Sequence, residues 1–176
     1  MKIIETERLI VRELQDTDAP FILQLLNDAS FLYYIGDKGV RTVEDARQYI
    51  LNGPVASYEQ NGFGLYLVEL KTGSVPIGMC GLIKRSELSH PDIGFAFLPD
   101  YWSKGYGLES AAAVLRHGVE VLKLKRIVAI TSPDNEASGR LLTKIGLEYD
   151  RMYRLSEDRA EVKLFVKDFS KPENVE

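Results

Sequence analysis

The stretch Trp102-Ser103-Lys104-Gly105-Tyr106-Gly107-Leu108-Glu109 is the most informative part of the sequence, because it joins a strand pattern directly to a helix pattern. Residues 92–97 before it (DIGFAF) are typical of a strand. The residues after it predict a helix with one apolar face, formed by Leu108, Ala112, Leu115, Val119 and Leu122. Two glycines let the backbone come close to a ligand, and the free N–H groups of a first helical turn attract phosphate. The stretch indicates either a diphosphate site or a tight strand-to-helix turn.

Two common phosphate motifs are not met at this position. A P-loop ends in Gly-Lys-Ser/Thr, whereas Gly107 is followed by Leu108 and Glu109. A dinucleotide fingerprint requires a third glycine or alanine where Ser110 stands, and an acidic residue where the next strand ends in Thr131. Neither nucleotide fold is therefore expected.

Composition and charge narrow the class of protein. The chain has 176 residues, 45% of them hydrophobic and 27% charged, which is typical of one soluble globular domain. A formal net charge of −4 disfavours a nucleic-acid binder, so no direct nucleic-acid partner is expected. Charges interrupt the first eight residues, and no apolar run approaches the roughly 20 residues that span a bilayer. We expect a cytoplasmic protein without a membrane segment.

The rest of the chain alternates between strand and helix patterns. A strand begins at Leu9, a helix follows residues 16–18, and a second helix begins at Thr42 with Asp45 in capping-box position. Residues 63–70 and 75–84 read as a hairpin. Residues 126–130, 136–145, 147–155 and 161–169 then read as strand, helix, strand and strand. The order β-α-α-β-β-β-α-β-α-β-β predicts an α/β fold in one domain, residues 1–169, with a C-terminal tail at 170–176.

Three segments together resemble the GNAT superfamily of acetyl-CoA-dependent N-acetyltransferases. Residues 92–109 look like its cofactor-binding strand, loop and helix. Residues 133–138 (PDNEAS), continuing to 144–147 (KIGL), resemble its Asn-x-x-Ser motif and the following Gly-Phe/Leu. Residues 7–12 (ERLIVR) look like the start of the branch with ribosomal-protein N-terminal acetyltransferases. The resemblance implies a mixed, mostly antiparallel twisted sheet of six to seven strands with helices on both faces, and an acetyltransferase that needs no metal.

The resemblance also implies where coenzyme A binds. Its pyrophosphate would lie on the backbone amides of residues 103–108, which are Ser103, Lys104, Gly105, Tyr106, Gly107 and Leu108. Its pantetheine arm would run beside the strand that ends at Phe97 and Leu98. Asn135 matches a cofactor-contacting asparagine, although it could also be only a helix N-cap. Arg140 is a candidate for phosphate contact. Trp102 stands where the family usually has Gln or Arg, which puts one polar contact in doubt.

Catalysis in this family is direct attack of an amine on the thioester, without a protein nucleophile. Asp92 aligns with a carboxylate that many relatives use as the base; it would act directly or through water, or else face solvent as a strand-end carboxylate. Ser138 matches a serine near the thioester sulfur. Leu142 stands where many members have an acidic Tyr, so Ser138 replaces that acid or no dedicated acid exists. The lone Cys80 reads as a buried hydrophobe, with a reactive thiol as the alternative.

The sequence says least about the amine that would accept the acetyl group. The branch favours a protein N-terminal α-amine. A polyamine would need converging carboxylates, for which Glu44, Asp45 and Glu59 are available. A third possibility is a catalytically silent acetyl-CoA-binding module. Five aromatic residues come from segments that form the acceptor side in relatives, and each could equally be core: Phe31, Tyr33, Tyr34, Tyr58 and Phe63. Either a monomer or a homodimer is expected.

Overall fold

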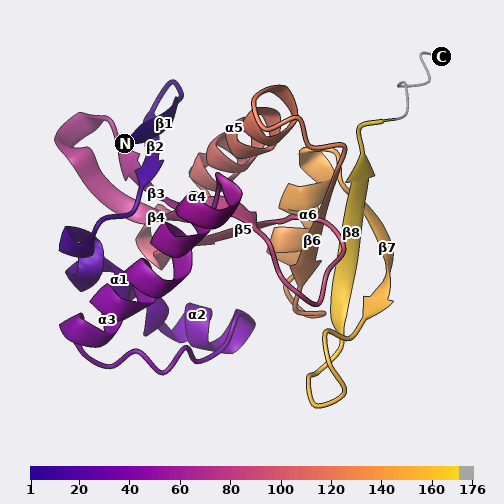
Figure 1. The fold of residues 1–176 in the computed structure, drawn as a ribbon, viewed down its shortest axis with the longest axis horizontal. Helices are drawn as coiled ribbons and strands as arrows, with labels where there is room; N and C mark the ends of the chain where they lie inside the picture. Colours follow the sequence, from indigo (N-terminus) through magenta and orange to yellow (C-terminus); the bar gives the residue numbers. More distant parts are fainter. Residues whose placement is uncertain (171–176) are drawn as a thin grey trace.

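The structure is a computed structural model that describes residues 1–170. One eight-stranded sheet runs through the molecule in the order β1-β2-β3-β4-β5-β6-β8-β7 (Figure 1). Its strands are β1 Lys2–Glu5, β2 Leu9–Glu13, β3 Leu65–Leu70, β4 Val75–Ile83, β5 Asp92–Phe97, β6 Arg126–Thr131, β7 Glu148–Tyr153 and β8 Val162–Asp168. The helices are α1 Ala19–Leu26, α2 Ala29–Tyr34, α3 Val43–Ile50, α4 Ala56–Asn61, α5 Tyr106–Glu120 and α6 Glu136–Lys144.

The predicted α/β architecture is confirmed, and the strand count is one higher than expected. All neighbouring strands are antiparallel except β5 and β6, so the sheet is mixed and mostly antiparallel. The unexpected strand is β1, which pairs with β2 through Ile4 and Val11. This strand has only four residues and begins and ends with the charged residues Lys2 and Glu5, so the sequence pattern does not predict it. The proposed tail, 170–176, lies outside the described residues from 171 onward.

Hydrophobic residues fill both faces of the sheet, as alternation along the strands requires. On β3, Leu67 packs with α1 and α3, which contribute Ile22, Leu25 and Ile50. Its neighbours Tyr66 and Val68 belong to the opposite cluster, which includes α5 residues. Among residues 1–170 no helix has the length and apolarity to cross a bilayer.

Helix α5 buries a wider face than its large residues predict. Leu115 is buried, and Val119 and Leu122 pack against the core as predicted, whereas Leu108 is 38% exposed. Ala111, Val114 and Gly118 are also buried. A Cβ added at Gly118 would lie 3.0 Å from a methyl carbon of Leu82 on β4. Small residues let α5 approach the sheet closely, and a pattern weighted by large side chains does not detect such a contact.

Helix ends follow local signals more closely. Thr42 caps α3 as predicted, and Asp45 completes the capping box. The helix then passes through a π-helical turn at Leu51–Val55, which contains Pro54, and continues as α4. Gly146, at φ 99°, follows the end of α6 in the left-handed conformation that glycine adopts most easily.

Strands β5 and β6 part soon after they meet, and this divergence positions the site. Within residues 1–170, the two strands pair at one position, where Asp92 lies opposite Val128. The Val128 amide also donates a hydrogen bond to the Pro91 carbonyl at 3.0 Å. On its other side β5 stays paired with β4 over its whole length, from Asp92 to Phe97. Beyond Asp92, one edge of β5 therefore has no neighbouring strand within residues 1–170.

Candidate active site

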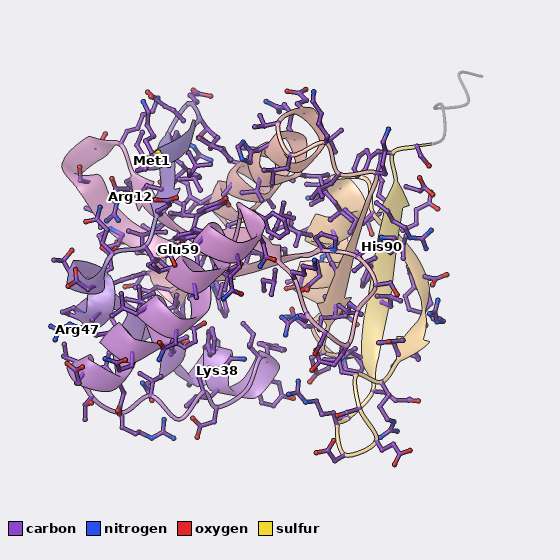
Figure 2. The ribbon with its side chains drawn as sticks, in the orientation of Figure 1. Met1, Arg12, Lys38, Arg47, Glu59 and His90 are labelled. Carbon is purple, nitrogen blue, oxygen red and sulfur yellow. The ribbon has the colours of Figure 1, made fainter. Side chains whose placement is uncertain are left out.

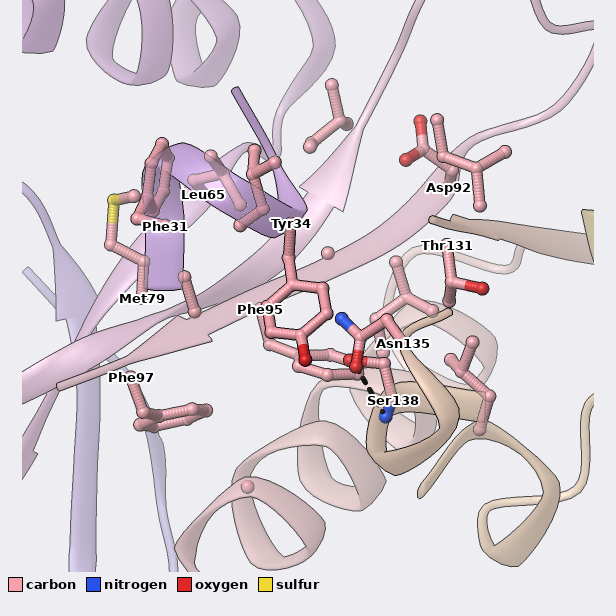
Figure 3. Close-up of a pocket in the computed structure, with 18 of the residues that line it drawn as sticks. Phe31, Tyr34, Leu65, Met79, Asp92, Phe95, Phe97, Thr131, Asn135 and Ser138 are labelled. Carbon is pink, nitrogen blue, oxygen red and sulfur yellow. Dashed lines mark hydrogen bonds between the residues drawn. The ribbon is translucent and has the colours of Figure 1, made fainter. Parts of the chain in front are cut away.

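A cleft of about 1440 Å³ opens where β5 and β6 diverge. Its walls come from β5, the loop before α5, the start of α6 and helix α2 (Figure 3). Asp92, Phe95, Phe97, Asn135 and Ser138 all line it. The structure thus brings the predicted base, the strand edge and the α6 motif into one cavity.

The free edge of β5 can pair with an extended ligand. The Leu98 amide donates to the Ile77 carbonyl of β4 at 3.0 Å, so it is already engaged. Because backbone groups alternate in an antiparallel ladder, those of Phe95 and Phe97 face away from β4, toward the cleft. The Trp102 indole N–H donates to the Phe97 carbonyl at 2.9 Å. Trp102, which stands where the family usually has Gln or Arg, therefore forms a hydrogen bond with the edge of β5.

The loop before α5 exposes a group of backbone amides. Ser103 and Gly105 have left-handed φ angles of 59° and 83°, and Gly105 begins the helix without a side-chain cap. The first amides of the 15-residue helix therefore lack the partner that a capping side chain would provide. Such amides and the helix dipole favour an anion. The amides of Tyr106 and Leu108, predicted to bind pyrophosphate, belong to this turn.

The two glycines of the loop have different roles. Gly105 requires its positive φ, as shown above. A Cβ added at Gly107 would lie 3.0 Å from Leu141 of α6 and 3.7 Å from Phe97. Gly107 thus lets α5, α6 and β5 approach one another, and a substitution there disturbs packing before it reaches a ligand.

The N-terminal hairpin holds this loop in place. The Arg8 guanidinium donates to the Lys104 carbonyl at 2.9 Å and to the Glu109 carboxylate at 2.7 Å, and it lies 4.4 Å from the centre of the Tyr106 ring. The Thr6 hydroxyl donates to the same carboxylate at 2.6 Å. The sequence showed Arg8 only as part of a family resemblance; its contacts with residues about one hundred positions away give it a physical role.

Asp92 is buried at the inner end of the cleft, with 1% of its surface exposed. It does not face solvent. Burial raises its pKa to about 6, and the nearby charge and hydrogen bond of Arg85 oppose that rise. The Arg85 Nε donates to its carboxylate at 3.0 Å. A carboxylate with this pKa is ionised at neutral pH and can still accept a proton efficiently.

Asn135 and Ser138 lie at the start of α6. The Asn135 side-chain oxygen accepts from the Ser138 amide at 3.2 Å, so Asn135 is an N-cap, and its side chain also borders the cleft (Figure 3). Arg140 lies on the same helix, mostly exposed, 3.7 Å from Glu136. Leu142 is buried at 1% exposure and has no acidic proton.

Helix α2 brings an aromatic residue into the cleft whose position the sequence could not show. The Tyr33 hydroxyl donates to Asp134 at 2.5 Å and ties α2 to the turn before α6. Tyr34 extends into the cleft, with its hydroxyl directed toward Asn135 and Ser138 (Figure 3). Thr131 also lines the cleft, and its buried hydroxyl has no hydrogen-bond partner within residues 1–170.

Other candidates are placed elsewhere. Phe31 lines the cleft with Tyr34, but Tyr58 stacks on Tyr66 at 5.4 Å, and both Tyr58 and Phe63 belong to the core. Cys80 is fully buried, and burial raises its pKa to about 12, so it is the inert hydrophobe rather than a reactive thiol. Glu44, Asp45 and Glu59 lie on α3 and α4 outside the residues that line the cleft.

Comparisons with known proteins agree with this geometry. Residues 8–148 match the family described as "Acetyltransferase (GNAT) domain". The chain is 30% identical over 154 residues to the uncharacterized N-acetyltransferase YoaA of Bacillus subtilis, with 86% of each chain covered.

Solved structures show the same fold. A GNAT-family acetyltransferase from Bacillus anthracis is 26% identical, with a TM-score of 0.78, over 96% of this chain and 99% of that one. RimL, a ribosomal L7/L12 alpha-N-protein acetyltransferase solved with coenzyme A, has a TM-score of 0.82 at 16% identity, over 96% of this chain and 98% of that one. The chain belongs to the GNAT family and is an acetyl-CoA-dependent N-acetyltransferase.

Proposed function

We propose that this protein transfers the acetyl group of acetyl-CoA to the α-amine of a protein N-terminus, by direct attack within a ternary complex. One observation carries the proposal: a buried carboxylate, Asp92, with a pKa of about 6, lies in the same cleft as an unpaired strand edge and the amides at the start of α5. The fold similarity to a ribosomal-protein α-N-acetyltransferase supports the class of acceptor.

The residues divide the work between binding and chemistry. The amides of residues 103–108 are placed to hold a diphosphate, and the edge of β5 at Phe95 and Phe97 can pair with amides of an extended arm. Holding an amine beside a thioester carbonyl in this way supplies about 7–11 kcal/mol of the barrier. The Phe97 amide, which does not face β4, can polarise that carbonyl, whereas the Leu98 amide is engaged with Ile77.

Asp92 accepts the proton that the substrate ammonium must lose before its nitrogen can attack the thioester. Its side chain is one methylene shorter than the glutamate usual in relatives, and a water relay would bridge the difference. Arg85 donates to its carboxylate and so orients it.

Two hydroxyl groups compete to protonate the departing thiolate. Ser138 lies on α6 at the position implied by the family, and Tyr34 reaches the same part of the cleft from α2 (Figure 3). We assign the role to Tyr34, because a phenol is a stronger acid than an aliphatic alcohol. Tyr34→Phe should lower kcat and leave the KM for acetyl-CoA nearly unchanged, while Ser138→Ala should have the smaller effect on kcat. The reverse order would assign the proton to Ser138.

A polyamine acceptor has no comparable support. The carboxylates that could have held one, Glu44, Asp45 and Glu59, do not converge on the cleft: Asp45 serves the capping box of α3, and Glu44 pairs with Arg47 at 2.8 Å.

The direct test is an acceptor screen. The protein is incubated with acetyl-CoA and short peptides with free or blocked α-amines, with spermidine, and with lysine-containing peptides blocked at the α-amine. Mass spectrometry locates the acetyl group, and Asp92→Asn serves as the matched inactive control. Acetylation of free α-amines alone is expected. Acetylation confined to spermidine or to lysine side chains would contradict the proposed acceptor.

A further inference from the structure

Three cationic side chains from three separate loops line the cleft, and one of them, Arg85, donates a hydrogen bond to Asp92. Lys38 follows α2, Arg85 lies between β4 and β5, and Arg159 lies between β7 and β8. Lys38 lies just beyond the end of α2 (Figure 2). Partial burial lowers the pKa of Lys38, and the charges of Arg85 and Arg159 lower it further. The cations are therefore close enough to repel one another.

The carboxylates that line the cleft are already engaged. Asp92 pairs with Arg85 at 3.0 Å, and Glu136 lies 3.7 Å from Arg140. Asp37 pairs with Arg41 at 2.5 Å, and Asp134 accepts hydrogen bonds from the hydroxyls of Ser132 and Tyr33. Each of the four carboxylates among the described residues that line the cleft thus has a hydrogen-bond or ion-pair partner, and for Asp134 the partners are hydroxyl groups in place of a cation.

Two of the cations, in contrast, have no ion-pair partner within residues 1–170: Lys38 and Arg159. Hydrogen bonds lower the pKa values of Glu87 and Asp158, and the charge of Arg159 lowers them further, but neither carboxylate forms a salt bridge with Arg159. Lys38 and Arg159 thus line the cleft without a salt bridge to any of residues 1–170.

The reaction places the acceptor beside these charges. An amine must approach Asp92 to be deprotonated, and Asp92 accepts a hydrogen bond from Arg85, one of the three cations. We propose that the acceptor carries a carboxylate or phosphate next to its reactive amine, and that Lys38 and Arg159 bind this anion. The inference rests on the proposed acetyl transfer and narrows its substrate to an acidic N-terminus or an anionic amino compound. The same positive charge would repel a polyamine.

Binding to the complex of the protein with coenzyme A tests the inference without requiring turnover. Calorimetry compares the C-terminally amidated peptide Ser-Asp-Glu-Ala with amidated Ser-Asn-Gln-Ala, which lacks the side-chain carboxylates, and glycine with glycinamide. We expect the acidic peptide to bind about tenfold more tightly, with a preference that weakens as salt screens the charges. A glycine preference without a peptide preference would identify a small anionic amine as the source of the anion. Equal binding within both pairs would overturn the inference.

Charge-reversal variants locate the site. Lys38→Glu and Arg159→Glu should each reduce the preference for the anionic ligand at least threefold, because each replaces an attractive charge with a repulsive one. Arg116→Glu is the matched control: it makes the same change on the exposed side of α5, outside the cleft lining. An equal loss in the control would show a general field effect and overturn the site.

Turnover separates this inference from the function on which it rests. Acetylation of acidic and neutral peptides with equal kcat/KM would refute the anion site and leave the α-amine acetyltransferase intact. Selective binding of the acidic peptide, without acetyl transfer to any amine, would refute the function and support the anion site.

Discussion

Asp92→Asn removes the charge of the proposed base and nearly preserves its shape. At a pKa of about 6, Asp92 is about one-tenth ionised at pH 5 and about nine-tenths ionised at pH 7. The kcat/KM of the unmodified protein should therefore rise roughly tenfold between these pH values. A positioned general base contributes roughly 10²–10⁴-fold, so the variant should lose activity of that order at pH 7, together with the pH dependence near 6.

The same substitution has a consequence for stability. The folded-state pKa of Asp92 lies above its ordinary value of 3.8, so between about pH 4 and pH 6 the folded protein holds this proton more tightly than the unfolded chain does. The contribution of Asp92 therefore favours folding below pH 4 and is lost as the pH rises to about 6. The loss amounts to about 3 kcal/mol. An asparagine carries no charge to desolvate, so relative to the unmodified protein the variant should gain stability as the pH rises.

Two assays measure these effects. A thiol reagent follows the release of coenzyme A from pH 5 to 8, and urea denaturation gives the free energy of unfolding at pH 4, 6 and 8. Calorimetry with coenzyme A confirms that the variant still binds its cosubstrate. If Asp92→Asn kept activity within about threefold and retained the limb near pH 6, Asp92 would not be the base. A stability difference that is independent of pH would show that its carboxylate is not buried as an ion.

Other predictions concern the same cleft. In Arg85→Gln the nearby positive charge that opposes the rise in the pKa of Asp92 is lost, so the acid limb of kcat/KM should move to higher pH; an unmoved limb would contradict the ion pair. Trp102 is the only tryptophan and is 47% exposed beside the loop, so its fluorescence should change as acetyl-CoA binds. An unchanged spectrum at saturation, with binding shown by calorimetry, would place the cosubstrate elsewhere. Gly105→Ala forces a side chain into a left-handed φ of 83°, 3.1 Å from Arg8, and should raise the KM for acetyl-CoA about tenfold with little change in kcat; an unchanged KM would show that this loop does not bind the diphosphate.

Local signals in the sequence were sufficient for most of the elements. Thr42 and Asp45 begin α3 because their hydrogen bonds span only three residues, and Gly146 follows α6 because its backbone angle suits glycine. The sequence pattern alone likewise predicts the strand, loop and helix around Gly105. The short β1 was missed because it is held by pairing with β2 and not by its own composition.

Long-range packing determines the burial and the mutual placement of the site residues, which local signals do not predict. Asp92 reads equally well as a surface carboxylate; its burial, and hence its pKa, comes from the strands and loops that surround it. Tyr34 enters the cleft from α2, which the hydrogen bond of Tyr33 connects to Asp134, about a hundred residues away. Lys38 and Arg159 line one cleft although they come from loops about 120 residues apart in the chain. Hydrogen bonds within one turn can be inferred from neighbouring residues, whereas burial and electrostatic coupling depend on groups distant along the chain, so they are defined only when the chain is folded.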